Sequence, residues 1–184
     1  MRIITGEFRG RRLYTPNNRM IRPTTDKVKE AIFSMIADKL YDAVVIDLFS
    51  GTGNLGLEAL SRGAKRCYFG DNSRESISLI KQNINYCKTE EKSVLYTGDY
   101  QKILKKINEK ADVIFLDPPY EMGLMLDCIK SISELGLLTE DGIIVAEHGM
   151  REILPKTIGS FEKMKEKRYG SVMVTIYVEI LANI

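Results

Sequence analysis

Few cysteines, a single histidine and the absence of any long apolar run exclude several classes of protein. The three cysteines, Cys67, Cys87 and Cys128, lie far apart and form no C-x-x-C pair, so they predict neither a disulfide framework nor a zinc site. The lone His148 does not build a metal site by itself, and no metal is expected. No apolar run approaches membrane-spanning length and the first residues lack a signal-peptide core, so we expect a soluble cytoplasmic protein.

The composition is that of an ordinary globular protein, with positive charge concentrated at one end. A length of 184 residues with 44% apolar residues suits one core, so we expect one domain, with a basic segment over 1–24 and the core over 25–184. Residues 1–30 contain eight Lys or Arg and three Asp or Glu, a net charge of 8 − 3 = +5, whereas the whole chain carries +2. This asymmetry indicates a polyanionic partner for the N-terminal segment, the alternative being a solubilising tail.

Apolar strands alternate with amphipathic helices through most of the chain. After a helix capped by Thr24 or Thr25, strands are expected at 44–49, 67–69, 94–96, 113–116 and 143–146. The intervening helices are expected at about 55–61, from Asn72 with Glu75 as capping-box partner, around 103–107 and at 124–135. This pattern is typical of a parallel sheet covered on both faces. The strict alternation over 172–180, which follows a second strand at 161–169 and a Gly-Ser turn, predicts an antiparallel C-terminal hairpin.

The run Asp117-Pro118-Pro119-Tyr120 lies where the apolar strand at 113–116 ends. The two prolines fix their own backbone angles, and Pro118 disfavours the helical region for Asp117, so the run is stiff and extended. The Asp117 carboxylate and the Pro118 carbonyl can accept both N–H bonds of an amino group on a planar ring, while Tyr120 stacks on its face. The run therefore predicts alkylation of an exocyclic amine on a base; the alternative is a rigid connector.

Glycines at 51, 53 and 56 satisfy G-x-G-x-x-G between a strand and a helix, which indicates a nucleotide-like ligand. A dinucleotide is the usual interpretation, and Asp71 lies where such a fold holds a ribose. Asp47, near the end of the strand beneath the loop, favours a different ligand, because its carboxylate repels a pyrophosphate and attracts a cation. S-adenosylmethionine carries a cationic amino group and a sulfonium, and it has no phosphate. The alternative role of Asp47 is to bind the loop backbone.

Acidic residues follow four of the expected strands. Asp47, Asp71, Asp99 and Asp117 all fall at the carboxyl edge of the sheet, where open α/β sheets bind their ligands. Asp99 can accept a hydrogen bond from the adenine amino group or cap the helix that begins near Tyr100. The sequence leaves both roles of Asp99 open.

Several segments, in order, resemble the RsmD-type methyltransferases, which modify guanine N2 in small-subunit ribosomal RNA. The resemblance covers nearly the whole chain and rests on 2–13, on 22–33 with its R-P-T-T start, on 47–56, on 117–120 and on 145–148. The glycine loop and the proline run recur in many amino-methyltransferases, whereas the R-P-T-T segment narrows the substrate. In one respect the chain departs from the family, which usually carries an acid at the tip of the second strand, where this chain has Gly70 followed by Asp71.

The resemblance implies an α/β, Rossmann-like class I fold with a mostly parallel seven-stranded sheet, and S-adenosyl-L-methionine as cofactor. It implies 16S rRNA, within the small ribosomal subunit or a late assembly intermediate, as partner. We expect a monomer. The catalytic candidates are Asp117, Pro118, Pro119 and Tyr120. The cofactor-binding candidates are Asp47, Phe49, Ser50, Gly51, Thr52, Gly53, Gly56, Asp71, Asn72, Asp99, Tyr100, Arg22 and Thr24. The candidates for RNA phosphate contacts are Arg9, Arg11, Arg12 and Arg22, of which Arg22 alternatively pairs with the cofactor carboxylate.

The expected mechanism is direct methyl transfer without a covalent enzyme intermediate. The acceptors at Asp117 and Pro118 favour a pyramidal amino nitrogen and so restore nucleophilicity to guanine N2, and positioning does most of the work. The alternatives are an amino-methyltransferase acting on adenine N6 or a glutamine side chain, a non-catalytic rRNA-binding assembly factor on the same scaffold, and a nicotinamide-dependent oxidoreductase. Adenosylmethionine binding distinguishes the enzyme from the scaffold protein and from the oxidoreductase.

Overall fold

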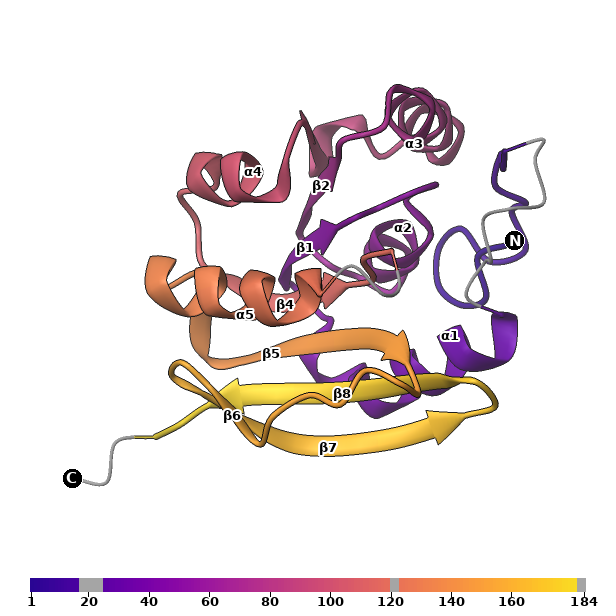
Figure 1. The fold of residues 1–184 in the computed structure, drawn as a ribbon. Helices are drawn as coiled ribbons and strands as arrows, with labels where there is room; N and C mark the ends of the chain where they lie inside the picture. Colours follow the sequence, from indigo (N-terminus) through magenta and orange to yellow (C-terminus); the bar gives the residue numbers. More distant parts are fainter. Residues whose placement is uncertain (17–24, 120–122, 182–184) are drawn as a thin grey trace.

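The computed structural model describes residues 1–16, 25–119 and 123–181, and the strands within these ranges form one mixed sheet. Its eight described strands follow the order β3-β2-β1-β4-β5-β8-β7-β6 (Figure 1). The parallel part consists of β1 (Val44–Leu48), β2 (Arg66–Asp71), β3 (Ser93–Thr97), β4 (Ala111–Leu116) and β5 (Leu138–Gly149). The antiparallel part consists of β8 (Val172–Glu179), β7 (Phe161–Tyr169) and β6 (Thr157–Ile158).

This architecture confirms the expected α/β class and the C-terminal hairpin, with two differences in the strands. The described part of the sheet has one strand more than the expected seven, because β6 consists of only two residues and is too short to show alternation. The strand expected at 143–146 extends over 138–149. Its first half is polar and exposed around Glu140 and Asp141. Because this part has neither an apolar run nor an alternating pattern, the sequence did not predict a strand there.

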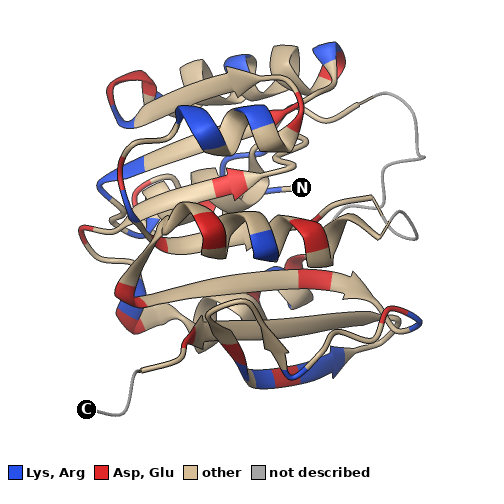
Figure 2. Cartoon of the chain, turned by 60° about the vertical axis from the view of Figure 1, so that its left-hand side comes forward, with Lys and Arg blue, Asp and Glu red and all other residues tan. Residues whose placement is uncertain are grey.

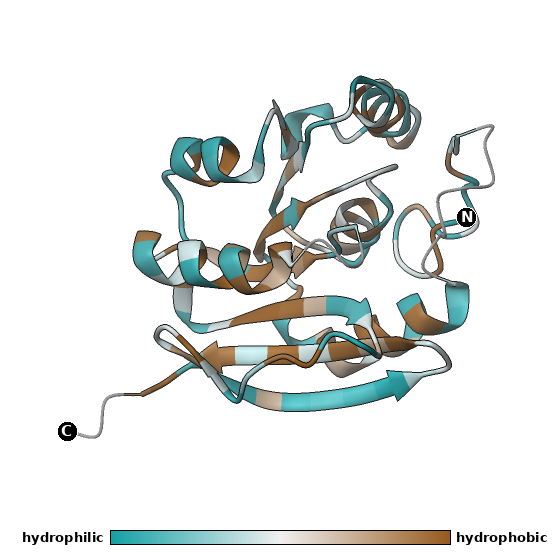
Figure 3. Ribbon diagram, viewed as in Figure 1, coloured by the Kyte–Doolittle hydropathy of each residue, from teal (hydrophilic) through white to brown (hydrophobic). Residues whose placement is uncertain are grey.

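Helices cover both faces of the sheet and create two apolar cores. α1 (Asp26–Met35), α2 (Asn54–Ser61) and α3 (Arg74–Cys87) pack on one face, and α4 (Tyr100–Lys106) and α5 (Leu124–Leu135) pack on the other. Short 3-10 turns at Ala37–Lys39 and Glu90–Lys92 lead into β1 and β3. β1 and β4 in the middle of the sheet are buried at nearly every residue, and the hydrophobic colouring of Figure 3 is strong along β4 and β5. Burial on both faces explains why these strands read as continuous apolar runs.

Three helices begin at side chains that cap their first turns. The Oγ1 atom of Thr25 accepts from Val28 N at the start of α1, so Thr25 is the cap, as one of the two expected alternatives. An Asp99 carboxylate oxygen accepts from Gln101 N at 2.9 Å, which confirms the capping role of Asp99. The expectation that Asn72 opens α3 is wrong. Ser73 caps this helix by accepting from Ser76 N, because Asp71 already binds the Ser73 amide and turns the chain before it.

Residues 1–14 form a folded segment beside α2 and α3, not a free basic arm (Figure 1). Ile3, Phe8 and Leu13 are buried in the core that these helices share. Gly6 has φ +93°, and a Cβ at this position would lie 1.9 Å from the Ser61 carbonyl oxygen, so only glycine permits this approach to α2. The approach brings the Glu7 amide to 2.8 Å from the same oxygen.

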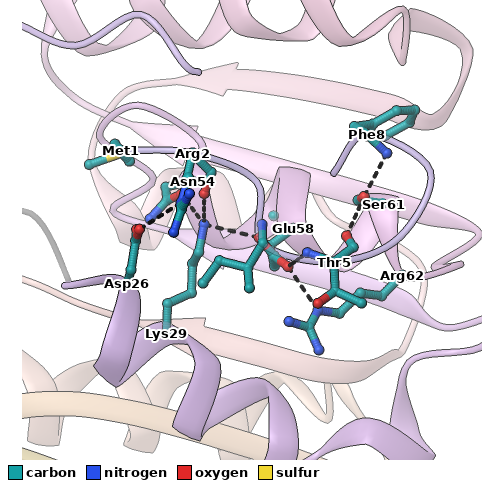
Figure 4. A network of polar contacts seen from close by, with 12 residues as sticks. Met1, Arg2, Thr5, Phe8, Asp26, Lys29, Asn54, Glu58, Ser61 and Arg62 are labelled. Carbon is teal, nitrogen blue, oxygen red and sulfur yellow. Dashed lines mark hydrogen bonds and ion pairs between the residues drawn. The ribbon is translucent and has the colours of Figure 1, made fainter. Parts of the chain in front are cut away.

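A buried ion pair joins this segment to α1 and α2 (Figure 4). Lys29 Nζ lies 3.0 Å from Glu58 Oε2, and both side chains are completely buried. The ammonium also donates to the Arg2 carbonyl and, at 2.7 Å, to Asn54 Oδ1, so its three N–H groups have partners. The Glu58 carboxylate accepts from the amides of Ile4 and Thr5 and from Arg62 Nε. These hydrogen bonds offset the free-energy cost of burying the two charges.

The far end of the sheet is charged and open to solvent. Basic residues and glutamates are interspersed along β7, which pairs with β8 and over two residues with β6 (Figure 2). An ion pair between Lys163 and Glu166 lies on this strand. Charged side chains on an edge strand oppose pairing with another chain, which accounts for this composition.

Within the described ranges, no helix combines the length and apolar character that crossing a bilayer requires.

Replacement of Lys29 by methionine is expected to destabilise the protein by on the order of 3 kcal/mol, because it leaves a buried carboxylate without its cationic partner. Urea unfolding measures this change as a lower transition midpoint at an unchanged slope. Arg2→Ala is the matched control, since it removes the exposed pair with Asp26 and is expected to cost no more than about 1 kcal/mol. Equal losses in the two variants would contradict the assignment of Lys29.

Candidate active site

The candidate site lies where the strand order reverses. β1 and β4 are neighbours with Leu48 opposite Leu116, so the glycine loop and the Asp117 segment leave the sheet side by side. From β1 the chain proceeds outward to β2 and β3 on one side, and from β4 to β5 on the other. The carboxyl edge at such a switch point opens a crevice between the diverging connections. The topology thus brings together residues that the sequence separates by about seventy positions.

The glycine loop turns sharply on residues with positive φ. Phe49, Gly51 and Gly53 have φ of +67°, +59° and +79°. Glycine adopts this region freely, whereas Phe49 is a bulky residue for which the left-handed region is uncommon. Surrounding contacts must hold Phe49 there, and strained backbone of this kind concentrates at ligand-binding sites. The Phe49 ring packs against that of Tyr100, with centroids 5.9 Å apart.

The backbone amides of the loop are already bound by groups of the protein. Gly51 N donates to Asp71 Oδ2 at 2.9 Å, and Gly56 N donates to Asp47 Oδ2 at 2.9 Å. Gly53 N donates to the Ser50 carbonyl at 2.8 Å. In a dinucleotide fold, amides at this helix N-terminus face the pyrophosphate. In this protein two of them face carboxylates of the chain itself, which leaves a negatively charged environment unsuited to a phosphate.

Asp47 lies beneath the loop and is almost fully buried, with 2% of its surface exposed. Its bond to Gly56 N confirms the backbone-binding role that the sequence left as an alternative. Burial raises the pKa of Asp47 to about 7, although the Gly56 hydrogen bond opposes the shift and the Asp71 carboxylate adds to it. A cation nearby would favour the ionised form and recover part of this cost.

Asp71 is the last residue of β2, opposite Thr97 of β3, so the strand ends on an acid. The expectation that Gly70 occupies this tip is therefore wrong. The Asp71 carboxylate accepts from Gly51 N with one oxygen and from Ser73 N with the other. A side chain at Gly70 would lie on the opposite face of the sheet from that of Asp71. Its Cβ would be 3.0–3.2 Å from side-chain atoms of Ile103 and Leu48. Close packing against α4 explains the glycine.

Asp117 is half-buried immediately after β4, with Pro118 buried and Pro119 exposed behind it. The register of β4 and β5 pairs Leu116 with Ala146, which places Asp117 beside Glu147 on the same face of the sheet. Burial first, and then the carboxylates of Glu147 and Asp47, raise the pKa of Asp117 well above its ordinary range. Carboxyls associated with three adjacent strands are thus close enough to interact electrostatically, and such strongly shifted groups are concentrated at functional sites.

The remaining candidates divide into three groups. Ser50 and Thr52 lie in the glycine loop and are buried, and Asn72 lies between Asp71 and the Ser73 cap. Arg9 and Arg12 are exposed, whereas Arg11 is half-buried and donates to the Tyr86 carbonyl. Arg22, Thr24 and Tyr120 lie outside the described residues. The cations of the first thirty positions are therefore not one patch, because Lys29 is buried and Arg2 pairs with Asp26.

Two asparagines whose hydrogen bonds hold the glycine loop and the start of α2 were not identified from the sequence. Asn83 of α3 donates from Nδ2 to the Thr52 carbonyl at 2.9 Å and to the Tyr14 carbonyl, and its Oδ1 accepts from Tyr14 N. Asn54, the first residue of α2, is bound by Lys29. Asn83 lies within a predicted helix, where a polar residue is ordinarily expected to face solvent, and Asn54 immediately precedes the helix expected at about 55–61. Glu147 lay in a segment of the family resemblance but received no role.

The fold and the site together define a Rossmann-like methyltransferase, and the chain belongs to the family described as "Conserved hypothetical protein 95", which it matches over residues 1–178. It is 38% identical over 180 residues to "Putative rRNA methyltransferase YlbH" of Bacillus subtilis, covering 96% of this chain and 98% of that protein. It is 32% identical over 177 residues to "Ribosomal RNA small subunit methyltransferase D" of Escherichia coli, covering 96% and 89%. The solved structure "Putative methyltransferase yhhF from Escherichia coli" superposes with a TM-score of 0.87, at 31% identity and 97% coverage of each chain.

Asp47→Asn is expected to stabilise the protein at pH 8 and to lose this advantage by about pH 4. The folded pKa of about 7 exceeds the unfolded value, so wild-type stability falls as pH rises through this window, and the amide carries no charge to bury. The gain at pH 8 is expected to be on the order of 1–3 kcal/mol. Chemical denaturation across this pH range checks it, and a gain that does not depend on pH would contradict burial of the Asp47 charge as its cause.

Proposed function

We propose that this protein transfers a methyl group from S-adenosyl-L-methionine to the exocyclic N2 amine of a guanine in small-subunit ribosomal RNA. The observation that carries the proposal is the convergence of Asp47 and Asp117 at the switch point, next to a glycine loop whose amides are bound by carboxylates. This arrangement suits a donor that is positively charged and an acceptor that presents N–H groups. The names of the relatives support the choice of RNA and of the small subunit.

The residues at the carboxyl edge fit adenosylmethionine better than a dinucleotide. Asp47 offers negative charge beneath the loop, where a cationic amino group and a sulfonium would lower the cost of its ionisation. Asp71 at the tip of β2 and Asp99 after β3 supply further carboxylates along the path of an extended ligand. Phe49 and Tyr100 supply aromatic surface beside it. When bound, the donor supplies an activated methyl group on sulfur.

The segment after β4 would hold the accepting amine. The Pro118 carbonyl and the Asp117 carboxylate present two acceptors on a backbone that the prolines stiffen, and these fit the two hydrogens of an exocyclic amino group. Binding both hydrogens favours the geometry in which the nitrogen lone pair leaves the ring plane. The nitrogen is then held for in-line attack, and the gain comes from positioning and electrostatics. The proton released at nitrogen passes to Asp117 or to solvent.

The base must leave its stack to reach this edge. Amino-group chemistry on a nucleobase requires an unpaired or flipped nucleotide, since the duplex buries the ring faces. The exposed Arg9 and Arg12 of the N-terminal segment provide phosphate contacts that position the strand. A methyl-transfer assay with tritiated donor, on small subunits, naked ribosomal RNA and DNA in parallel, tests the proposal. Label on guanine N2 of small-subunit RNA is expected, and label on adenine or on protein would refute it.

Asp117→Ala is expected to lower turnover by about 100-fold or more, because the amine loses one of its two acceptors. Donor affinity, measured by calorimetry, is expected to change little, since the side chain faces the accepting base. Asp127→Ala on the exposed start of α5 is the control and is expected to retain full turnover. Near-native turnover of Asp117→Ala would exclude this mechanism.

The raised pKa of Asp117 predicts an acid limb in the pH dependence of kcat/KM, because the acceptor must be ionised. Activity is expected to fall as pH decreases through a value above the ordinary carboxyl range. Glu147→Gln removes a neighbouring negative charge, so it is expected to move this limb to lower pH. Initial rates at saturating donor across a pH series measure the shift, and a limb that moves to higher pH would contradict it.

A further inference from the structure

Two half-exposed tyrosines meet where the N-terminal segment contacts the last turn of α3. Tyr14 and Tyr86 are 52% and 44% exposed, their ring centroids lie 5.7 Å apart, and the ring planes are inclined by 73°. We call these two residues, together with Arg11, the Tyr14–Tyr86 surface. An edge-to-face pair normally contributes by burial of both rings. About half of the surface of each of these two residues remains exposed, so burial alone does not explain the contact.

Arg11 holds the surface in one arrangement. Its Nη1 donates to the Tyr86 carbonyl at 3.1 Å, and its guanidinium lies 5.9 Å from the Tyr86 ring centroid and 5.2 Å from that of Phe8. Phe8 is buried, which anchors the guanidinium from below. Tyr14 is fixed separately, because its amide and carbonyl are both bound by Asn83. The two chain segments that carry the rings are therefore held in place by contacts within the protein.

The charge around this surface favours a polyanion. Arg9 and Arg12 are exposed and flank Arg11 in the chain. Together with Arg11 they place three arginines within four consecutive residues of this segment. Aromatic faces interleaved with arginines are the combination that binds single-stranded nucleic acid, since bases stack on the rings and phosphates pair with the cations.

We propose that the Tyr14–Tyr86 surface binds unpaired nucleotides of the RNA substrate by stacking, while Arg9 and Arg12 contact the flanking phosphates. The inference rests on the proposed function in taking RNA as the partner, and it adds a contact away from the reacting base. α3 starts at the edge that bears the site and Tyr86 lies in its last turn, so the surface stands roughly 20 Å away along the helix. An RNA strand of several nucleotides is needed to reach both.

The test measures binding of a fluorescently labelled oligouridylate and of a duplex RNA of equal length, without methyl donor. The double variant Tyr14→Leu/Tyr86→Leu keeps an apolar side chain at both positions but has no aromatic face. Tyr14→Phe/Tyr86→Phe keeps the face and loses only the hydroxyls. Tyr41→Leu is the matched control, since Tyr41 is 88% exposed in the turn before β1, outside this surface.

The leucine variant is expected to bind the oligouridylate about tenfold more weakly, because base stacking on an aromatic side chain is lost. The phenylalanine variant and the Tyr41 control are expected to bind as wild type does. Arg12→Gln is expected to reduce the salt dependence of binding, whereas the leucine variant leaves it unchanged. Wild-type affinity in the leucine variant, or an equal loss for single-stranded and duplex RNA, would overturn the proposal.

Steady-state methylation separates this inference from the proposed function. In the leucine variant, KM for the RNA substrate is expected to rise about tenfold with unchanged kcat, because the surface does not touch the reacting atoms. A fall in kcat at unchanged KM would overturn the stacking role. Tyrosine-dependent binding of the oligouridylate by a wild-type protein that methylates no RNA would support the surface and refute the methyl transfer.

Discussion

The glycine loop depends on two carboxylates that bind its backbone from opposite sides. Asp47 beneath the loop holds the Gly56 amide, and Asp71 at the end of the next strand holds the Gly51 amide. These contacts fix a turn that otherwise contains two glycines and the strained Phe49. They also reverse the electrostatic character of the loop, because groups that would bind a phosphate are already bound to acids. The choice between a phosphate-bearing and a cationic ligand follows from this constraint.

A buried ion pair fixes the part of the molecule next to this loop. Lys29 and Glu58 join α1, α2 and the N-terminal segment (Figure 4). Asn83 joins that segment to Thr52 of the loop. The segment that carries the exposed arginines therefore packs against the helices that frame the candidate site. Charges buried without water are stable only when every hydrogen bond is made, so this part of the molecule has little freedom to change. The proposed RNA contacts and the proposed methyl transfer would therefore share one well-packed support.

Sequence patterns predicted most of the fold, because the buried strands of a parallel sheet are apolar runs that can be recognised in the sequence. The strands around Val44 and Val113 and the helix Leu124–Leu135 were predicted close to their observed positions. Predictions failed where local polar contacts decide the outcome. Ser73 replaces Asn72 as a cap because Asp71 bends the chain, and β6 exists only because β7 offers it a partner. No sequence pattern indicated that Lys29 is buried, because lysine in a helix is ordinarily a surface residue.

By itself, the sequence determined the chemistry that the chain can perform. The Asp-Pro-Pro run, the spacing of Gly51, Gly53 and Gly56 and the acids after successive strands are local features, and each keeps its meaning without coordinates. Only the tertiary structure decided which of these groups act together. The reversal of strand order sets Asp47 near Asp117 and Glu147, and the packing of residues 1–14 sets Tyr14 against Tyr86. Such encounters join positions far apart in the chain, and no local pattern specifies them because burial and charge–charge distance are properties of the folded state.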